Sequence, residues 1–243
     1  MSIDPLAEDY VYNSPYAFAE NRVIDGRELE GLEWTSSTSS DGKTTNLNLN
    51  VHTENKTNGI LTNSQVATLA SERAMVLNKT LGGIDEQGRA VIVTVCENEN
   101  ATMTWEYNTV LTPDGIDFEG KSQKEIETTL GGALGITDKI GDTQNNRTQV
   151  NIAQPGNMGF VNDAGLPNFD DKNSRSATAT TGNHEDAHTL GLRHDNDPKN
   201  SNGKEQAKDR SNLMNNNDSN GRNISRKQRS EAIKLIEQQQ PKQ

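Results

Sequence analysis

The segment from His184 to His194 constrains the fold and the chemistry of this chain more than any other. It has the sequence HEDAHTLGLRH and contains three of the four histidines. His184 and His188 are four residues apart, and on an α-helix this spacing places both imidazoles on one face, about one turn apart. Two imidazoles placed in this way can bind one zinc ion. The sequence therefore predicts a helix that carries two ligands of a metal site.

Glu185, Gly191 and His194 complete the pattern. Glu185 follows the first histidine, so it lies beside the metal without being forced onto it, where a general base can take a proton from water. Gly191 can adopt a left-handed conformation and end the helix, and the chain can then turn back and bring His194 to the metal as a third ligand. Three histidine ligands leave a fourth position for water or substrate, which is typical of catalytic zinc sites.

The complete pattern, HExxHxxGxxH, resembles that of the metzincin metallopeptidases. That family also has a methionine turn after the third histidine, and Met214 is the only methionine that follows His194. The resemblance implies a zinc metalloendopeptidase that hydrolyses peptide bonds in a protein or peptide substrate, with Glu185 as general base. It also implies that Met214 packs beneath the zinc site.

The residues after the motif leave the subfamily open. Asp195 is similar to the adamalysin-like and snapalysin-like members, whereas the stretch from Thr189 to His194 is closer to matrixins. Asn216 stands where astacin-like and serralysin-like members have a tyrosine, so a fifth, tyrosine ligand is not expected. The cysteine-switch sequence of matrixin propeptides is missing.

The regions around the motif predict an α+β fold. Residues 46–54 alternate apolar and polar side chains, as a half-buried strand does, and a helix capped at Asn63 or Ser64 is expected to run to Leu81. Further expected elements are strands at 90–97, 103–111 and 149–153, a short helix at 123–130, and a last helix from the capping box of Ser225 and Gln228 to Ile236. The metzincin resemblance implies a mixed twisted β-sheet with a packed helix, an active-site helix and a C-terminal helix. Cys96, in the apolar run 89–97, is expected to be a small core residue.

Residues 1–34 resemble the end of an Rhs-type core, the shell terminus that precedes the variable effector of polymorphic toxins. The pieces that agree in order are Ile3-Asp4-Pro5-Leu6-Ala7, Tyr12-Asn13-Ser14-Pro15-Tyr16-Ala17-Phe18, Asn21, Asp25-Gly26 and Glu30-Gly31-Leu32-Glu33. The resemblance implies that the peptidase is the effector of an Rhs-type toxin, restrained by the shell or by an immunity protein. An ordinary surface arm is the alternative. The family's Asp-Pro-x-Gly element lacks its proline at Asp25, which puts self-processing there in doubt.

The remaining boundaries follow from composition. Residues 35–45 are small and polar without apolar periodicity, which is typical of a linker. We therefore expect a metzincin-like peptidase domain over 46–237 and a disordered tail over 238–243.

Charge and hydropathy exclude some partners. The net charge of −11 and a pI near 4.9 argue against nucleic acid and anionic membranes, because both would repel this surface. The sequence has no apolar run close to the ~18 residues that span a bilayer and no signal-peptide pattern at its start. A secreted or extracellular location would therefore need a delivery system that this chain does not encode.

Two alternatives to a metzincin-type peptidase remain. A catalytically inactive zinc-binding adhesion or interaction module would not need the general base Glu185. A gluzincin site would need a glutamate ligand further on, such as Glu205.

The acidic and amide residues at 195–197 and 215–218 could bind Ca²⁺, but their spacing matches no recognisable calcium loop, so we favour a solvated loop. His52 is expected at a surface or edge position.

Overall fold

The computed structural model describes residues 33–116, 118, 122–159, 168–194, 197, 210–215 and 222–240. By its internal contacts the chain divides after Leu32, and the second unit begins at Glu33. The segment predicted to resemble an Rhs-type core therefore lies almost wholly outside the described residues, and its assignment stays a prediction.

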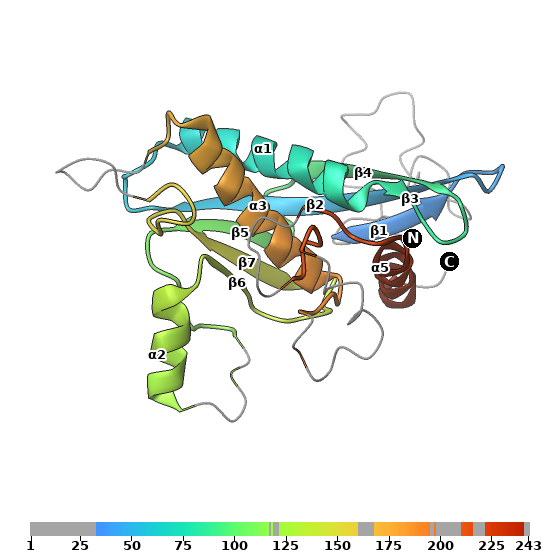
Figure 1. Ribbon diagram of the computed structural model, residues 1–243. Coiled ribbons are helices and arrows are strands. Elements are labelled where there is room, and N and C mark those ends of the chain that lie inside the picture. The colour runs from blue at the N-terminus through green and yellow to red at the C-terminus, as the bar shows by residue number, and fades with distance from the viewer. Residues whose placement is uncertain are drawn as a thin grey trace, which may run out of the picture. The chain divides into compact units, whose positions relative to one another are not determined.

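The described residues form a mixed sheet with helices packed against it (Figure 1). Its strands are β1 (Trp34–Thr38), β2 (Thr44–Lys56), β3 (Gly83–Ile84), β4 (Ala90–Glu97), β5 (Met103–Asn108), β6 (Gly135–Thr137) and β7 (Asn146–Asn151). Their order is β3-β4-β2-β5-β7-β6, and β1 pairs with β2 outside this path. The pairs β2–β4, β2–β5 and β5–β7 are parallel, whereas β1, β3 and β6 pair antiparallel. The predicted α+β class with a mixed sheet is confirmed.

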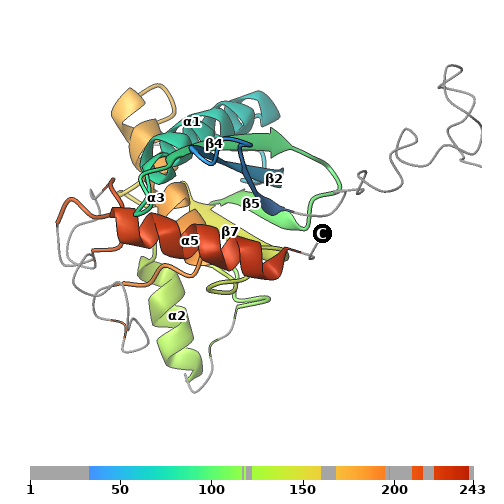
Figure 2. The ribbon, with the colours of Figure 1, turned by 90° about the vertical axis from the view of Figure 1, so that its right-hand side faces the viewer.

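The helices are α1 (Asn63–Leu81), α2 (Gln123–Gly132), α3 (Lys172–Thr189) and α5 (Arg226–Gln239). α1 contacts β2 and β4, α3 contacts β6 and β7, and the two helices contact each other, so both cover one face of the sheet (Figure 1). α2 projects away from the sheet and buries none of its residues. α5 packs against β1 (Figure 1). In the view of Figure 2, α5 runs between α1 above it and α2 below it. The helix that carries the histidine motif, α3, thus packs against both α1 and the sheet.

The alternation of side chains in β2 and β4 determines which face the helices cover. Leu47 and Leu49 of β2 and Val93 of β4 are buried on the helix side. Ile92 and Cys96 point to the other face of β4, and both are exposed. The prediction that Cys96 is a core residue was therefore wrong, because this strand is apolar on both faces but is covered on only one.

Residues 35–45, predicted to be a linker, instead form a β-hairpin. β1 pairs with β2 from Trp34 opposite Leu49 to Thr38 opposite Thr45, and the Ser39 amide donates to the Thr44 carbonyl at 2.8 Å. A run of serine and threonine suits a linker, but threonine also favours strands when a neighbouring strand is present. The folded unit therefore begins before residue 46.

Most predicted elements are present with small shifts in their bounds. The helix that runs to Leu81 is confirmed, but its predicted cap at Asn63 or Ser64 was wrong. The N-cap is Thr62, because Thr62 and Gln65 form a capping box. The capping box of Ser225 and Gln228 is also confirmed.

α5 continues to Gln239, so the tail predicted from residue 238 begins too early. The structural reason is that the Gln239 side chain accepts from the Thr143 amide at 2.9 Å.

Arg229 of α5 binds the C-terminal end of α1. Its guanidinium donates to the carbonyls of Leu81 at 2.6 Å, Thr80 at 3.2 Å and Ile84 at 2.8 Å. The last carbonyls of a helix have no partner within the helix and carry partial negative charge. A buried cation is therefore well matched to them and joins α5 to α1.

We expect Arg229→Ala to lower the free energy of unfolding by about 2–3 kcal/mol, because buried carbonyls lose a charged donor. Urea denaturation of the purified chain measures this change. Arg226→Ala, at an exposed position of the same helix, is the control and should change stability by less than about 0.5 kcal/mol. Equal stability of the two variants would contradict the role given to Arg229.

Candidate metal centre

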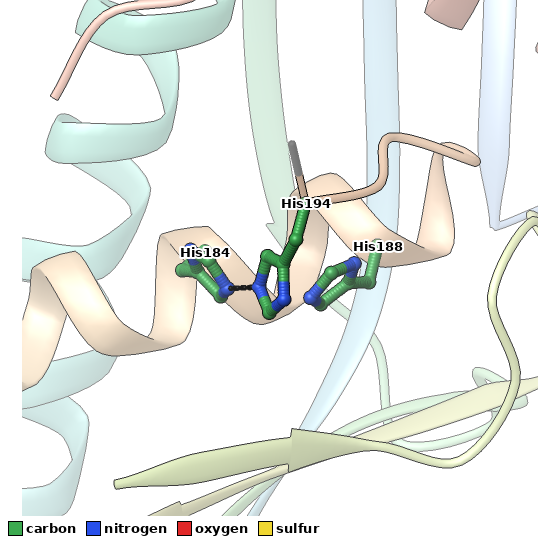
Figure 3. A group of neighbouring side chains, drawn as sticks. All are labelled: His184, His188 and His194. Carbon is green, nitrogen blue, oxygen red and sulfur yellow. Dashed lines mark hydrogen bonds between the residues drawn. The ribbon is translucent and has the colours of Figure 1, made fainter. Parts of the chain in front are cut away.

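His184, His188 and His194 come together as the sequence predicts (Figure 3). α3 places the first two on one face, and the chain after the helix brings the third. The Nε2 atoms of His184 and His194 are 2.8 Å apart, and one ring nitrogen from each histidine lies within 4.8 Å of the others. The three histidines are therefore close enough to bind one metal ion.

Backbone carbonyls fix the orientation of two of the rings. His184 Nδ1 lies 2.8 Å from the Leu213 carbonyl, and His188 Nδ1 lies 2.8 Å from the Leu192 carbonyl. Because a carbonyl only accepts, each Nδ1 must carry the proton and donate it. The Nε2 atom of each neutral ring then has a free lone pair. Ligating histidines commonly donate their second nitrogen in this way.

Burial keeps these imidazoles uncharged. It lowers the pKa of His184 to about 4, with His194 as the second cause. Burial also lowers the pKa of His188 well below its usual value, and the two neighbouring histidines add to the effect. Without a cation, the lone pairs of neutral rings so close together would repel each other or have to share a proton. The donor set therefore fits a metal ion.

Gly191 ends α3 and reverses the chain toward His194, as its position in the motif predicts. Its φ of +77° is left-handed, and its amide donates to the His188 carbonyl at 2.9 Å as α3 ends. A Cβ atom at this position would lie 3.0 Å from Leu235 Cδ2 of α5. Both the backbone conformation and the close packing thus favour glycine, and the reversal that brings in His194 depends on them.

Met214 is fully buried in a tight turn next to the site. The Met214 amide donates to Asn212 Oδ1 at 2.9 Å, and the Asn212 side chain bonds to Gln228 of α5 at 2.7 Å. Leu213 in the same turn supplies the carbonyl that orients His184. The turn thus links the C-terminal helix to a histidine of the centre. Sequence reasoning identified Met214, and it identified Gln228 only as part of the capping box of the last helix; it did not identify Asn212.

Glu185 lies in the same region and is 6% exposed. The Thr137 hydroxyl lies 2.8 Å from Glu185 Oε2 and can donate to it. Burial raises the pKa of Glu185 to about 7, against the lowering effects of Thr137 and of Arg73. A Cβ atom on Gly135 would come within 3.0 Å of Glu185 Cγ, so this glycine lets β6 approach the carboxylate. Neither Thr137 nor Gly135 could be identified from the motif.

A cavity of about 410 Å³ opens at this site. Its lining includes His184, His194 and Glu185 from the motif, and Leu134 and Gly135 from the chain at β6. Two of the three histidines and a titratable carboxylate therefore face one space next to β6.

Asp186, the next residue of α3, lies in a buried polar network. It bonds to the Arg73 guanidinium at 2.6 and 2.9 Å and accepts from Trp105 Nε1 at 2.9 Å. Arg73 also lies over the Trp105 ring, 4.1 Å from its centroid, and donates to Thr148 at 2.5 Å. A Cβ atom on Gly182 would lie 2.6 Å from Arg73. The network therefore fixes α3 against α1 and the sheet, one residue from Glu185.

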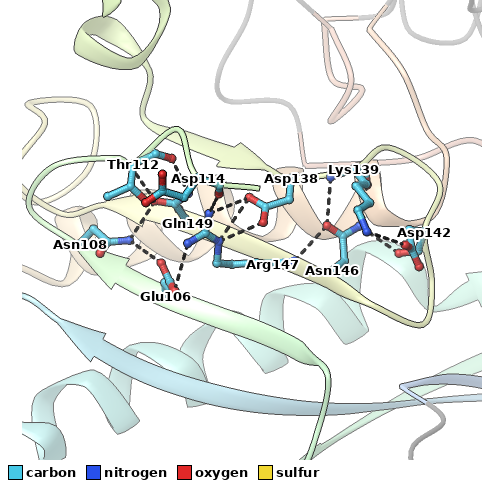
Figure 4. Close-up of polar contacts among 10 residues, drawn as sticks. All are labelled: Glu106, Asn108, Thr112, Asp114, Asp138, Lys139, Asp142, Asn146, Arg147 and Gln149. Carbon is cyan, nitrogen blue, oxygen red and sulfur yellow. Dashed lines mark hydrogen bonds and ion pairs between the residues drawn. The ribbon is translucent and has the colours of Figure 1, made fainter. Parts of the chain in front are cut away.

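Arg147 of β7 supports the strand that faces the cavity (Figure 4). Its Nε lies 3.1 Å from Asp138 Oδ2, and its Nη1 lies 3.5 Å from Glu106 Oε1. It also donates to the Asp114 carbonyl. Burial raises the pKa of Asp138, and Arg147 opposes this shift. Because Asp138 follows Thr137, the ion pair holds the end of β6 beside Glu185.

Several residues named from the sequence lie outside the described residues. These are Asp195, Glu205 and Asn216, together with most of the two stretches considered for Ca²⁺. Within the first stretch, Asp197 pairs with Arg193 at 2.8 Å. These interpretations therefore stay predictions.

No family model matches the sequence, and no curated protein matches it either. Each helix in the described part of the chain is too short or too polar to span a bilayer. The interpretation of the metal centre therefore depends on its own residues and their geometry.

Proposed function

We propose that this chain is a zinc-dependent metalloendopeptidase. The observation that carries the proposal is that three imidazoles meet beside a buried carboxylate, Glu185, which faces the same cavity as two of them. Three histidine ligands would leave zinc a fourth position, as catalytic zinc sites do. The HExxHxxGxxH pattern, the buried turn at Met214 and the mixed sheet before α3 support a metzincin-like enzyme.

The residues around the cavity suggest how the reaction would proceed. Zinc held by the three histidines would supply a Lewis acid that polarises the peptide carbonyl and lowers the pKa of water to about 7. Glu185 would take a proton from that water and pass it to the leaving amine. Its own pKa of about 7 suits a group that must both accept and release a proton near neutral pH. Thr137 would hold one carboxylate oxygen and leave the second for proton transfer.

The substrate class follows from the position of β6. Among the strands of the described residues, β6 is the last at its end of the sheet, and the chain at Leu134 and Gly135 lines the cavity. The open edge of a strand binds extended peptides through backbone hydrogen bonds. We therefore propose a protein or peptide segment in extended conformation as the substrate.

The resemblance of residues 1–34 to an Rhs-type core supports a biological role for this peptidase. We propose that it is the effector of an Rhs-type toxin and reaches its target through a delivery system outside this chain. An immunity protein that covers the cavity would then be its natural inhibitor. Co-expression with the gene next to its own, followed by purification of a complex, tests this role.

Glu185→Gln is expected to reduce the cleavage of denatured casein by about 10²–10⁴-fold, the usual contribution of a general base. The substitution keeps the size of the side chain, and Glu185 is not a ligand, so the zinc content should stay at one ion per chain. Cleavage by the wild type should also stop with 1,10-phenanthroline and return with added zinc.

Glu237→Gln, at an exposed position of α5, is the matched control and should cleave casein like the wild type. If Glu185→Gln retains full activity, the role of Glu185 is wrong. A wild type that binds zinc but cleaves neither casein nor a mixture of unfolded proteins would favour the inactive binding module instead.

A further inference from the structure

Strand β2 extends beyond its neighbour β4. The parallel pairing of the two strands ends at Val51 opposite Glu97, and one more bond follows, from the Asn98 amide to the Val51 carbonyl at 2.9 Å. From His52 to Lys56, β2 pairs with β5 on its other edge. Among the described residues, no strand pairs with the β4 side of β2 after Val51.

A side chain occupies part of this open edge. Glu97 Oε1 accepts from the Thr53 amide at 2.7 Å, and Glu97 Oε2 accepts from the Thr53 hydroxyl at 2.7 Å. In a parallel sheet alternate residues direct their backbone groups to the same edge, so the Thr53 carbonyl and the Asn55 amide also face this side. The Glu97 side chain is 54% exposed and can move away. The edge is thus closed by a movable carboxylate where a neighbouring strand would place a carbonyl.

A groove of about 800 Å³ runs along the same edge. Val51, Val66 and Trp105 are apolar residues of its lining, and α1 forms one wall with small side chains from Ala67, Ala70, Ser71 and Ala74. Small residues on this wall leave room for the side chains of an added strand. None of the residues that line the groove also lines the cavity of the metal centre.

The negative charge of Glu97 at the groove favours extended segments that carry a basic side chain. A strand that takes the Thr53 amide would displace Glu97, whose carboxylate would then lack the partners it has now. The nearest ring nitrogen is His52 Nδ1, 3.4 Å away, and Glu54 on the same rim already pairs with Lys56. A lysine or arginine of the incoming chain would neutralise Glu97, and the net charge of −11 favours the same choice.

We propose that this groove binds an extended segment of a second protein. The segment adds to the edge of β2 in line with β4, and one of its basic side chains pairs with Glu97. Backbone hydrogen bonds provide the affinity. The small side chains that α1 places on the groove wall, together with Glu97, provide the selectivity. The site is separate from the metal centre and does not depend on peptidase activity.

The test uses the full chain with Glu185→Gln, so that a probe peptide is not cleaved. The probe is the peptide Thr-Val-Thr-Lys-Thr-Val-Thr-amide with fluorescein on its N-terminus, so that the lysine stays charged, and its binding is followed by anisotropy. A second peptide has Gln in place of Lys, and a third has Pro at alternate positions and cannot pair as a strand. We expect saturable binding of the first peptide below about 1 mM, binding of the second about three- to fivefold weaker, and no binding of the third.

Two variants locate the binding site. Ser71→Phe fills the groove and should weaken binding at least tenfold, whereas Thr68→Phe, at an exposed position of α1 that does not line the groove, should bind like the parent. Glu97→Gln should remove the preference for the lysine peptide. Hydrogen exchange should show new protection of the Asn55 amide when the peptide binds.

Three results would overturn the proposal. One is that the lysine peptide does not saturate the chain below about 1 mM. Another is that Ser71→Phe and Thr68→Phe bind equally well. The third is that the free chain self-associates in sedimentation experiments and that Ser71→Phe abolishes the association, because the occupant would then be a second copy.

Discussion

Asp186→Asn is expected to lower the free energy of unfolding by about 3–5 kcal/mol, which is among the largest effects of any single substitution in this chain. Both partners of the pair are buried, with side-chain exposures of 0% for Arg73 and 2% for Asp186. An amide keeps the shape of the carboxylate but leaves the Arg73 charge without compensation inside the protein. It also directs an NH₂ group toward a guanidinium that can only donate. Chemical denaturation of the zinc-free chain measures the loss.

The double variant Arg73→Met, Asp186→Leu tests whether the loss of stability in Asp186→Asn comes from leaving one buried charge unpaired. Removing both charges should restore most of the stability, to within about 2 kcal/mol of the wild type, because no buried charge is then left unpaired. Asp170→Asn, at an exposed position just before α3, serves as the matched control and should have almost no effect. If Asp186→Asn is as stable as that control, the pair does not hold α3 in place.

The sequence predicted the features of the site that are encoded locally. A helix brings His184 and His188 together by its own periodicity, and Gly191 ends that helix without help from distant residues. The capping box of Ser225 and Gln228 is local in the same sense, since its members are three positions apart. For these features, the pattern and the structure depend on the same short-range geometry.

The features that the sequence did not predict depend on contacts between distant segments. Arg73 and Asp186 are 113 residues apart, and nothing near either residue indicates its partner. Thr137 reaches Glu185 from a strand of three residues, which is too short to have a recognisable periodicity. The hairpin at β1 was missed for the same reason, because a serine-rich and threonine-rich run becomes a strand only beside β2. Sequence patterns thus located the three converging histidines but not the residues that orient them.

Zinc is expected to stabilise the wild type by about 4 kcal/mol at a free concentration a thousandfold above its Kd, because the ion binds the folded chain in preference to the unfolded one. For a chain of this size, that corresponds to a rise in Tm of roughly 8–16 °C. Thermal unfolding with EDTA and with buffered zinc measures the shift. His188→Ala should remove most of it, since two ligands remain and the ring oriented by the Leu192 carbonyl is lost.

His52→Ala is the matched control for this shift, because it removes the fourth histidine of the chain. His52 lies on β2, where its ring faces Glu97 at 3.4 Å, and it does not belong to the group of residues that can hold a metal ion. The zinc-dependent rise in Tm should therefore persist in full. Equal shifts for His52→Ala and His188→Ala would mean that zinc binds elsewhere, and the three converging histidines would then need another explanation. A shift that is lost only with His184, His188 or His194 would instead assign the metal to the end of α3, where Glu185 can act on a bound substrate.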